Sequence, residues 1–162
     1  GKWLVSQGIA APQRLAIVGW SYGGYAALQS GVTEPGLFKA IVAVAPVTDL
    51  GRFKQHAKDF TNAELVAASI GSGPHVVQGS PLQNVERIAA PVLLFHGDRD
   101  INVDVEQSKL MDKALRAAGK KSELTVFPGL AHSLEDSAAR TKMLERMATF
   151  LRQTTGGQAA SK

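Results

Sequence analysis

Three short runs of continuous apolar residues limit most strongly how this chain of 162 residues can fold. The runs cover residues 14–19, 38–45 and 91–96, and a fourth run at 122–127 is also rich in strand-forming residues. When a strand is apolar at successive positions, both of its sides are buried, which is typical of a parallel sheet covered by helices on both faces. The runs therefore predict the strands of an α/β fold with a parallel sheet.

Helical patterns lie between and after these runs. Residues 23–30 are rich in small side chains, whereas residues 105–118 and 136–152 carry apolar residues close to the 3.6-residue period of a helix. Asp104 followed by Gln107 predicts a capping box at the start of the second helix. Strands that alternate with helices in this order indicate βαβ units.

The stretch 49–90 departs from this alternation. It contains several glycines and prolines and only one weakly helical segment, at 61–70. We interpret it as an insertion that lies over one end of the sheet and shapes a pocket. The domain is expected to cover residues 1–153, and residues 154–162 are expected to form a flexible tail.

The segment G-W-S-Y-G at residues 19–23 follows a predicted strand and precedes a predicted helix. This is the setting of the G-x-S-x-G nucleophile elbow, a tight turn that presents a serine hydroxyl. Glycine is expected at 19 and 23 because side chains there would collide across the turn. Ser21 is the candidate nucleophile, and Tyr22 N–H, at the start of the helix, is the candidate oxyanion donor. The alternative is a Gly-rich turn without catalysis.

A serine hydroxyl needs a base, and the base needs a carboxylate that orients it. His132 lies in the loop after the last predicted strand, and Asp98 and Asp100 lie in the loop after the strand before it. The order Ser, Asp, His along the chain is that of α/β-hydrolases. We therefore assign His132 as the general base. Spacing leaves Asp98 and Asp100 open as the carboxylate, because either side chain could instead bond its own turn.

The other three histidines have simpler interpretations. His56 and His75 lie in the insertion, where they are expected to be solvated or to line the pocket. His96 ends a predicted strand immediately before a turn, where a structural hydrogen bond is the expected role.

Composition excludes several kinds of chemistry. The chain has no cysteine and therefore no disulfide, thiolate zinc site or catalytic thiol. Its His and carboxylate spacings do not form a metal motif such as H-E-x-x-H, so no metal or cofactor is expected. The net charge is +4, but the basic residues are dispersed, which argues against a nucleic-acid partner. No apolar run is long enough for a membrane span, the first residues lack the apolar core of a signal peptide, and the sequence indicates no compartment.

A series of motifs occurs along the chain in the order G-W-S-Y-G-G-Y, A-P-V-T-D, S-P, P-V-L-L-F-H-G-x-x-D-x-x-V and P-G-x-x-H. Together they resemble the C-terminal half of the catalytic domain of the prolyl oligopeptidase family of serine peptidases, over residues 2–152. The resemblance implies an α/β-hydrolase fold, and it selects Asp100 over Asp98 because the family's catalytic aspartate follows H-G-x-x. It also implies that the pocket for the residue before the scissile bond is bordered by Trp20, Tyr22, Leu50, Phe53 and Val103.

The sequence also departs from the family's pattern. Ser133 follows His132 where the family often has glycine, and many esterases of the same fold have serine there. The chain begins just before the strand of the elbow. We therefore expect it to lack the fold's N-terminal strands, the second oxyanion donor and the family's β-propeller.

The sequence thus predicts a serine hydrolase, and first of all a serine peptidase that cleaves short peptides through an acyl-enzyme on Ser21. A carboxylesterase or other acyl hydrolase with the same triad is one alternative. An inactive fragment that needs the missing N-terminal half is the other. The expected partners are a short peptide or small ester as substrate, and that N-terminal half or further copies of this chain.

Overall fold

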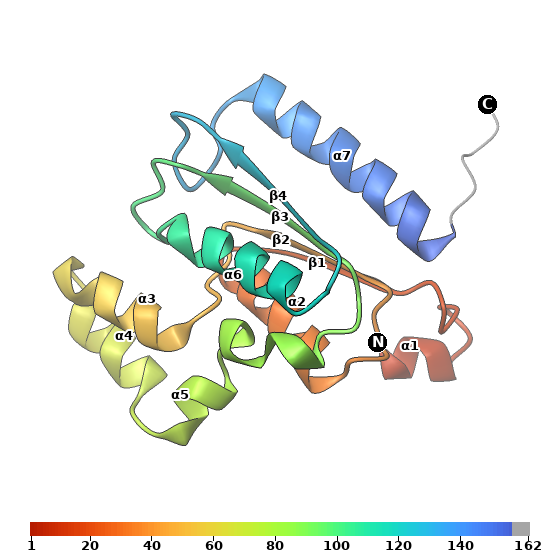
Figure 1. Ribbon diagram of the computed structural model, residues 1–162, viewed down its shortest axis with the longest axis horizontal. Coiled ribbons are helices and arrows are strands. Elements are labelled where there is room, and N and C mark those ends of the chain that lie inside the picture. The colour runs from red at the N-terminus through yellow and green to blue at the C-terminus, as the bar shows by residue number, and fades with distance from the viewer. Residues whose placement is uncertain (157–162) are drawn as a thin grey trace.

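A parallel sheet of four strands forms the centre of the computed structural model, which describes residues 1–156 (Figure 1). The strands lie side by side in the order of the chain and are β1 (Ala16–Trp20), β2 (Ala40–Val44), β3 (Val92–Gly97) and β4 (Ser122–Phe127). Each neighbouring pair is parallel, so the carboxyl ends of all four strands lie at one end of the sheet. The predicted parallel sheet is confirmed.

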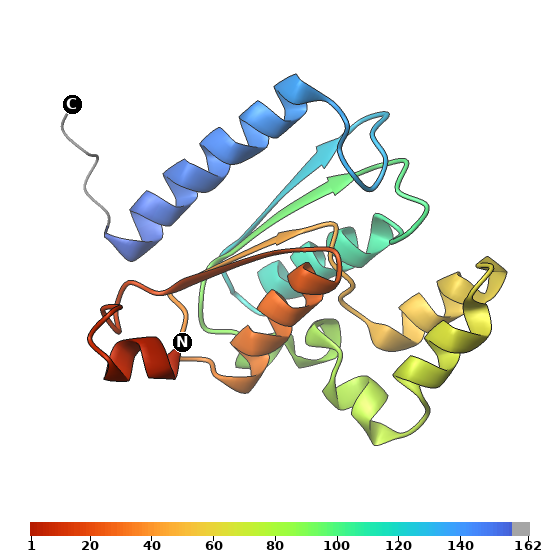
Figure 2. The same cartoon turned by 180° about the vertical axis from the view of Figure 1, so that it is seen from behind.

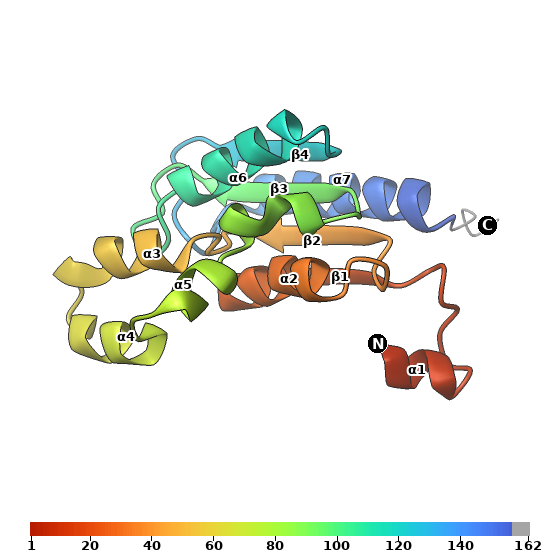
Figure 3. The same ribbon diagram turned by 60° about the horizontal axis from the view of Figure 1, so that its bottom comes forward.

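Helices cover both faces of the sheet (Figure 2 and Figure 3). The helices α2 (Tyr22–Thr33) and α6 (Glu106–Ala117) pack on one face, and α7 (Ser137–Thr155) packs on the other. The sequence predicted all three, although α2 and α7 extend beyond the expected ranges. Residues 154–155, assigned to the tail by the sequence, belong to α7, and residues 157–162 of the predicted tail lie outside the described residues.

The continuous apolar runs follow from this layering. In β2, Ile41 and Ala43 pack in the core beneath α2 and α6, whereas Val42 and Val44 pack in the core beneath α7. Both β2 and β3 are buried at every position. Successive side chains of a strand point to opposite faces, so a strand between two helical layers is apolar throughout.

The insertion at 49–90 is more helical than the sequence predicted. Glycine and proline mark the boundaries of its helices, since Gly71 follows one helix and Pro74 opens the next. Asp49 caps the N-terminus of its first helix, because the Asp49 side chain accepts a hydrogen bond from Arg52 N at 2.9 Å. The elements are α3 (Leu50–His56), the 3-10 helix η1 (Ala57–Asp59), α4 (Ala63–Ile70), α5 (Pro74–Gln78) and the 3-10 segment η2 (Pro81–Arg87). Figure 1 shows α3 and α4 beyond the carboxyl ends of the strands.

Within the described residues β1 is an edge strand, since it pairs with β2 alone. Val18, in the middle of β1, is 48% exposed. The short helix before this strand, α1 (Lys2–Ser6), was not predicted from the sequence. None of the helices formed by residues 1–156 is long and apolar enough to cross a membrane.

Candidate active site

Ser21 lies in the turn between β1 and α2, and its backbone conformation is one that L-amino acids rarely adopt. Its φ is 57° and its ψ is −120°. Two backbone hydrogen bonds hold the turn: Ser21 N donates to Val44 O at 2.8 Å, and Tyr25 N donates to Ser21 O at 3.0 Å. The strained serine is the feature that the elbow motif predicted, and it lies at the N-terminus of α2.

The close approach of the two arms of this turn requires glycine at position 19. A Cβ atom there would lie 1.9 Å from Gly23 O. Gly24 is constrained as well, because its Cβ would lie 2.9 Å from Pro46 Cβ. The predicted collision at Gly23 is wrong, since a Cβ there meets nothing within 4 Å. The reason is that Gly23 lies on the exposed side of the first turn of α2.

Asp100 and His132 meet in the loops that follow β3 and β4. His132 Nδ1 lies 2.6 Å from Asp100 Oδ2, within a short hydrogen bond. The other carboxylate oxygen, Oδ1, accepts hydrogen bonds from Asn102 N and Val103 N, each at 2.9 Å. These bonds fix the direction of both oxygens of the carboxylate.

The charge of Asp100 is maintained by these neighbours. Burial by itself raises the pKa of this carboxyl group, but hydrogen bonds from His96, Val103 and His132 outweigh burial and hold the pKa below its ordinary value. The Asp100 side chain is fully buried, so these donors replace the water that a free carboxylate would bind. An ionised Asp100 keeps the proton of neutral His132 on Nδ1 and leaves Nε2 as the basic nitrogen.

The loop after β3 is joined to the loop after β4 by close contacts. Asp98, the other aspartate that spacing left open, lies on the surface, and its Oδ1 accepts a hydrogen bond from Gly129 N at 2.6 Å. A Cβ at Gly97 would lie 2.2 Å from Leu130 O, so this approach requires glycine. Asp98 therefore connects the two loops, whereas Asp100 binds His132.

Ser21 and His132 line the same cleft, which has a volume of about 450 Å³. Within the described residues the His132 side chain makes its hydrogen bond through Nδ1, which leaves Nε2 available in the cleft. Phe53 and Val103, both predicted as pocket residues, line the cleft as well.

A second cavity, of about 270 Å³, adjoins the cleft. The two share Phe53, Asn62 and Val66 as lining residues. The second cavity is mostly apolar, and the predicted pocket residues Tyr22 and Leu50 contribute to it. Its position beside the cleft suits it to hold an apolar side chain of a molecule bound at Ser21.

Trp20 lines neither of these cavities. Its ring packs against the core beneath α7, and its Nε1 donates a hydrogen bond to His132 O at 3.2 Å. The structure thus brings four of the five predicted pocket residues to the cleft or the adjoining cavity. The fifth, Trp20, supports the backbone of the histidine instead.

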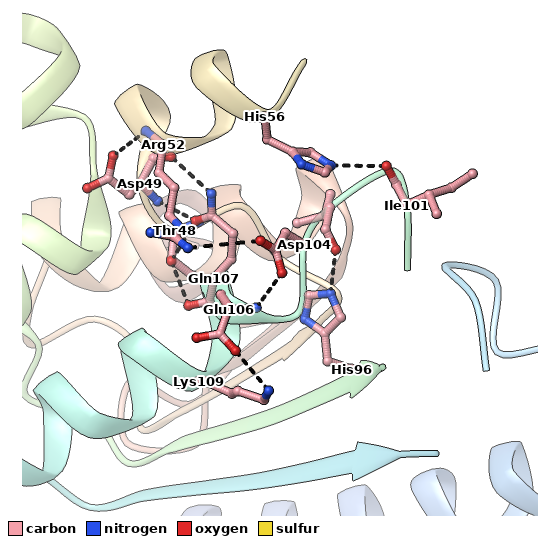
Figure 4. A network of polar contacts seen from close by, with 11 residues as sticks. Thr48, Asp49, Arg52, His56, His96, Ile101, Asp104, Glu106, Gln107 and Lys109 are labelled. Atoms are coloured by element: carbon pink, nitrogen blue, oxygen red, sulfur yellow. Dashed lines mark hydrogen bonds and ion pairs between the residues drawn. The ribbon is translucent and has the colours of Figure 1, made fainter. Parts of the chain in front are cut away.

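A polar network joins the insertion to α6 and to the loop that carries Asp100 (Figure 4). Gln107, buried in the first turn of α6, accepts hydrogen bonds through Oε1 from Thr48 N, Thr48 Oγ1 and Asp49 N, at 2.8–2.9 Å. His56 Nε2, at the end of α3, lies 3.0 Å from Ile101 O. The insertion that lines the cavity is therefore held at two points beside the loop that carries Asp100.

The predicted capping box at the start of α6 is wrong. Asp104 Oδ1 accepts a hydrogen bond from Glu106 N, whereas a capping box would have it accept from Gln107 N. The helix begins at Glu106. The Gln107 side chain does not return to the helix start because it binds Thr48 and Asp49, where the insertion begins, 58–59 positions away along the chain. The sequence held no local signal for this contact.

The remaining histidines divide into an exposed and a buried kind. His75 lies on the surface of the insertion, with Nε2 2.8 Å from Ile70 O. His96 is fully buried, and its predicted structural hydrogen bonds are confirmed by contacts to Ser108 and Val103. The described residues contain no group of three or more His, Cys, Asp or Glu side chains that could hold a metal ion.

Comparison with known proteins agrees with this geometry. The chain matches the model of the prolyl oligopeptidase family over residues 1–158. Dipeptidyl peptidase family member 1 of Caenorhabditis elegans is 34% identical over 142 residues, which are 87% of this chain and 17% of that protein. Dipeptidyl peptidase 4 of Bos taurus is 29% identical over 147 residues, which are 90% of this chain and 19% of that protein.

Solved structures show the same fold. The structure of a puromycin-hydrolysing peptidase from Mycobacterium tuberculosis superimposes with a TM-score of 0.89 and 32% sequence identity, and the match covers 99% of this chain and 25% of that one. The predicted α/β-hydrolase fold is confirmed by this likeness. The chain spans between 17% and 25% of the length of the relatives named here.

Proposed function

This chain belongs to the prolyl oligopeptidase family, and we propose on that basis that Ser21, Asp100 and His132 are the catalytic triad of a serine peptidase. The proposed activity is hydrolysis of peptide bonds in short peptides. The hydrogen bond of 2.6 Å between His132 Nδ1 and Asp100 Oδ2 carries the proposal, because this contact prepares a histidine to accept a serine proton. The cleft shared by Ser21 and His132 supports it further.

In the first half of the reaction Ser21 Oγ attacks the carbonyl carbon of the substrate and its proton passes to His132 Nε2. The C–N bond then breaks, and Nε2 returns the proton to the leaving amine. In the second half, water gives a proton to Nε2 and attacks the ester on Ser21. The C–O bond to Ser21 then breaks, Nε2 returns the proton to Ser21 Oγ, and the acid is released. Asp100 remains ionised throughout and stabilises the imidazolium.

Negative charge develops on the carbonyl oxygen during both halves. Tyr22 N–H is the first amide of α2, where backbone N–H groups have no partner within the helix. Together with the positive end of the helix dipole, this amide is suited to donate to the oxyanion. We propose Tyr22 N–H as one donor of the oxyanion hole.

The adjoining cavity of about 270 Å³ points to the kind of substrate. It has the size and the apolar lining to hold one apolar side chain next to the bond attacked by Ser21. The relatives are named dipeptidyl peptidases and a puromycin-hydrolysing peptidase, which supports a peptidase activity for this chain.

The experiment that tests the triad is labelling with a fluorophosphonate probe, followed by mapping of the labelled residue by mass spectrometry. We expect labelling at Ser21 that disappears in Ser21→Ala. The matched control is Ser133→Ala, because Ser133 is exposed beside His132 and has no part in the proposed reaction. A folded sample that shows no labelling at Ser21 would contradict the proposal and leave the chain as an inactive fragment.

A panel of substrates then tests the peptidase assignment. We expect cleavage of prolyl and alanyl amides, with loss of cleavage in Ser21→Ala. Hydrolysis of short-chain esters without cleavage of any amide would instead support the esterase that the sequence left as an alternative.

A further inference from the structure

His96 is a buried histidine that the proposed reaction does not use. It lies near the end of β3, and its side chain and that of Asp100 are both 0% exposed. Its Nε2 lies 2.8 Å from Val103 O and 3.2 Å from Asp100 Oδ2, and its Nδ1 lies 2.7 Å from Ser108 Oγ. Both ring nitrogens therefore have polar partners, as a buried imidazole requires.

These partners determine where the ring carries its hydrogen. Val103 O and Asp100 Oδ2 both accept, so Nε2 must be the protonated nitrogen. Ser108 is also fully buried, and within the described residues its hydroxyl has His96 Nδ1 as its partner. The hydroxyl therefore donates to Nδ1, since a second proton on the ring would leave the hydroxyl hydrogen without an acceptor. His96 is neutral, with its hydrogen on Nε2.

We propose that His96 is a positioning residue for Asp100, a role that rests on the proposed catalytic function of that aspartate. His96 acts at both oxygens of the carboxylate. It faces Oδ2, the oxygen that binds His132, directly. It reaches Oδ1 through Val103, because it binds the Val103 carbonyl while the Val103 N–H donates to Oδ1.

A carboxylate has about four sites for hydrogen-bond donors. At Asp100 these face His132 and His96 on Oδ2 and two backbone N–H groups on Oδ1. Donors at both oxygens oppose rotation of the carboxylate, so Oδ2 stays directed at His132 Nδ1. Without His96 the Val103 carbonyl loses its partner, and Oδ2 retains His132 alone.

Ser108, which holds the far side of the His96 ring, follows Gln107 in the first turn of α6. Figure 4 shows the His96 ring directed from β3 toward the loop that precedes α6, and the Gln107 side chain directed from α6 toward Thr48 and Asp49. The His96 ring is thus held on one side by a helix, through Ser108, and on the other side by the Val103 carbonyl, as a positioning role requires.

The test compares two amides in place of the imidazole. His96→Gln places its amide nitrogen near the position of Nε2 and can still donate toward Asp100 and Val103. His96→Asn is shorter and reaches only the position of Nδ1, next to Ser108. The exposed His75→Asn is the matched control for a histidine-to-asparagine change away from the site.

We expect the rate of fluorophosphonate labelling to fall on the order of tenfold to a hundredfold in His96→Asn. His96→Gln is expected to recover part of this loss, and His75→Asn to label at the original rate. Equal labelling rates in His96→Asn and the unchanged chain, or equal losses in both His96 variants, would overturn the positioning role.

A second measurement does not depend on activity, and its first part uses the unchanged chain alone. Nitrogen NMR of the unchanged chain near neutral pH should show His96 as the neutral Nε2–H form. Proton NMR should show a low-field signal for the His132 Nδ1 proton. This signal is expected to weaken in His96→Asn and to persist in His96→Gln. A proton on His96 Nδ1 would overturn the inference even if Ser21 is labelled. Absence of labelling with this tautomer present would contradict the proposed function alone.

Discussion

Replacing Asp100 by asparagine should disable the base by more than the loss of one hydrogen bond. The backbone dictates how the new amide lies: Asn102 N and Val103 N both donate to Oδ1, so the amide oxygen must take that place. The NH2 group then stands where Oδ2 stood, 2.6 Å from His132 Nδ1. Two donors cannot share a hydrogen bond, so His132 must carry its proton on Nε2.

With its proton on Nε2, His132 cannot accept the proton of Ser21. Loss of the charge-assisted bond alone costs about 1.5–3 kcal/mol, or roughly tenfold to a hundredfold in rate. The unsuitable tautomer adds to this loss, and the same substitution in a Ser-His-Asp protease lowers turnover by about ten thousandfold. We expect a loss of about three to four orders of magnitude in Asp100→Asn.

The assay is the second-order rate constant for fluorophosphonate labelling of Ser21, together with hydrolysis of an alanyl amide. Asp98→Asn is the matched control, because Asp98 lies in the same loop but contacts Gly129 N rather than the histidine. It should label within a few-fold of the unchanged chain. A loss of less than about tenfold in Asp100→Asn would refute the tautomer reasoning, and an equal loss in Asp98→Asn would refute the assignment of Asp100.

Three further outcomes follow from the geometry. Gly19→Ala should lower the free energy of unfolding by about 3 kcal/mol or more, whereas Gly23→Ala should change it by about 1 kcal/mol at most. Equal urea midpoints for the two variants would contradict the conclusion that only Gly19 is required by the turn. The pKa of Asp100 is lower in the folded state than the value of about 3.9 in the unfolded chain, so ionised Asp100 stabilises the fold at pH values above about 3.9. This stabilisation is lost as the pH falls from there through the folded-state pKa. The stability difference between the unchanged chain and Asp100→Asn should therefore be constant near neutral pH and shrink in acid, and a difference that persists in acid would contradict this. Gln107→Leu leaves the Thr48 and Asp49 amides unpaired and should destabilise the chain by about 2–3 kcal/mol or more. It should also raise KM more than it lowers kcat. An unchanged thermal midpoint would contradict the role of this network.

The residues of the proposed triad could be found from the sequence because of a property of parallel sheets. Ser21, Asp100 and His132 each follow a strand, and the carboxyl ends of parallel strands lie at the same end of the sheet. Three loops far apart in the chain are thus brought together by topology alone. The strands themselves could be predicted because burial on both faces leaves continuous apolar runs.

The contacts that support the site could not be predicted in the same way. The partners of Gln107 lie 58–59 residues away, where the chain enters the insertion. Within the insertion, the glycines and prolines that predict loops stand at helix boundaries instead. The family resemblance implies that Trp20 borders the pocket, but Trp20 is the last residue of β1 and its side chain lies on the face of the sheet that α7 covers. Its ring therefore packs beneath α7.

The first turn of α6 connects two parts of the site that are separate in the sequence. Gln107 holds the start of the insertion, and Ser108 holds His96, which faces Asp100. Adjacent residues on a helix point about 100° apart, so a single turn can reach both partners. A rigid helix that binds both the insertion, which lines the cavity, and His96, which faces Asp100, keeps these two parts at a fixed separation. Catalysis by positioning requires such a fixed separation. We therefore expect the distance between a bound substrate and His132 to depend on a helix that carries none of the proposed catalytic residues.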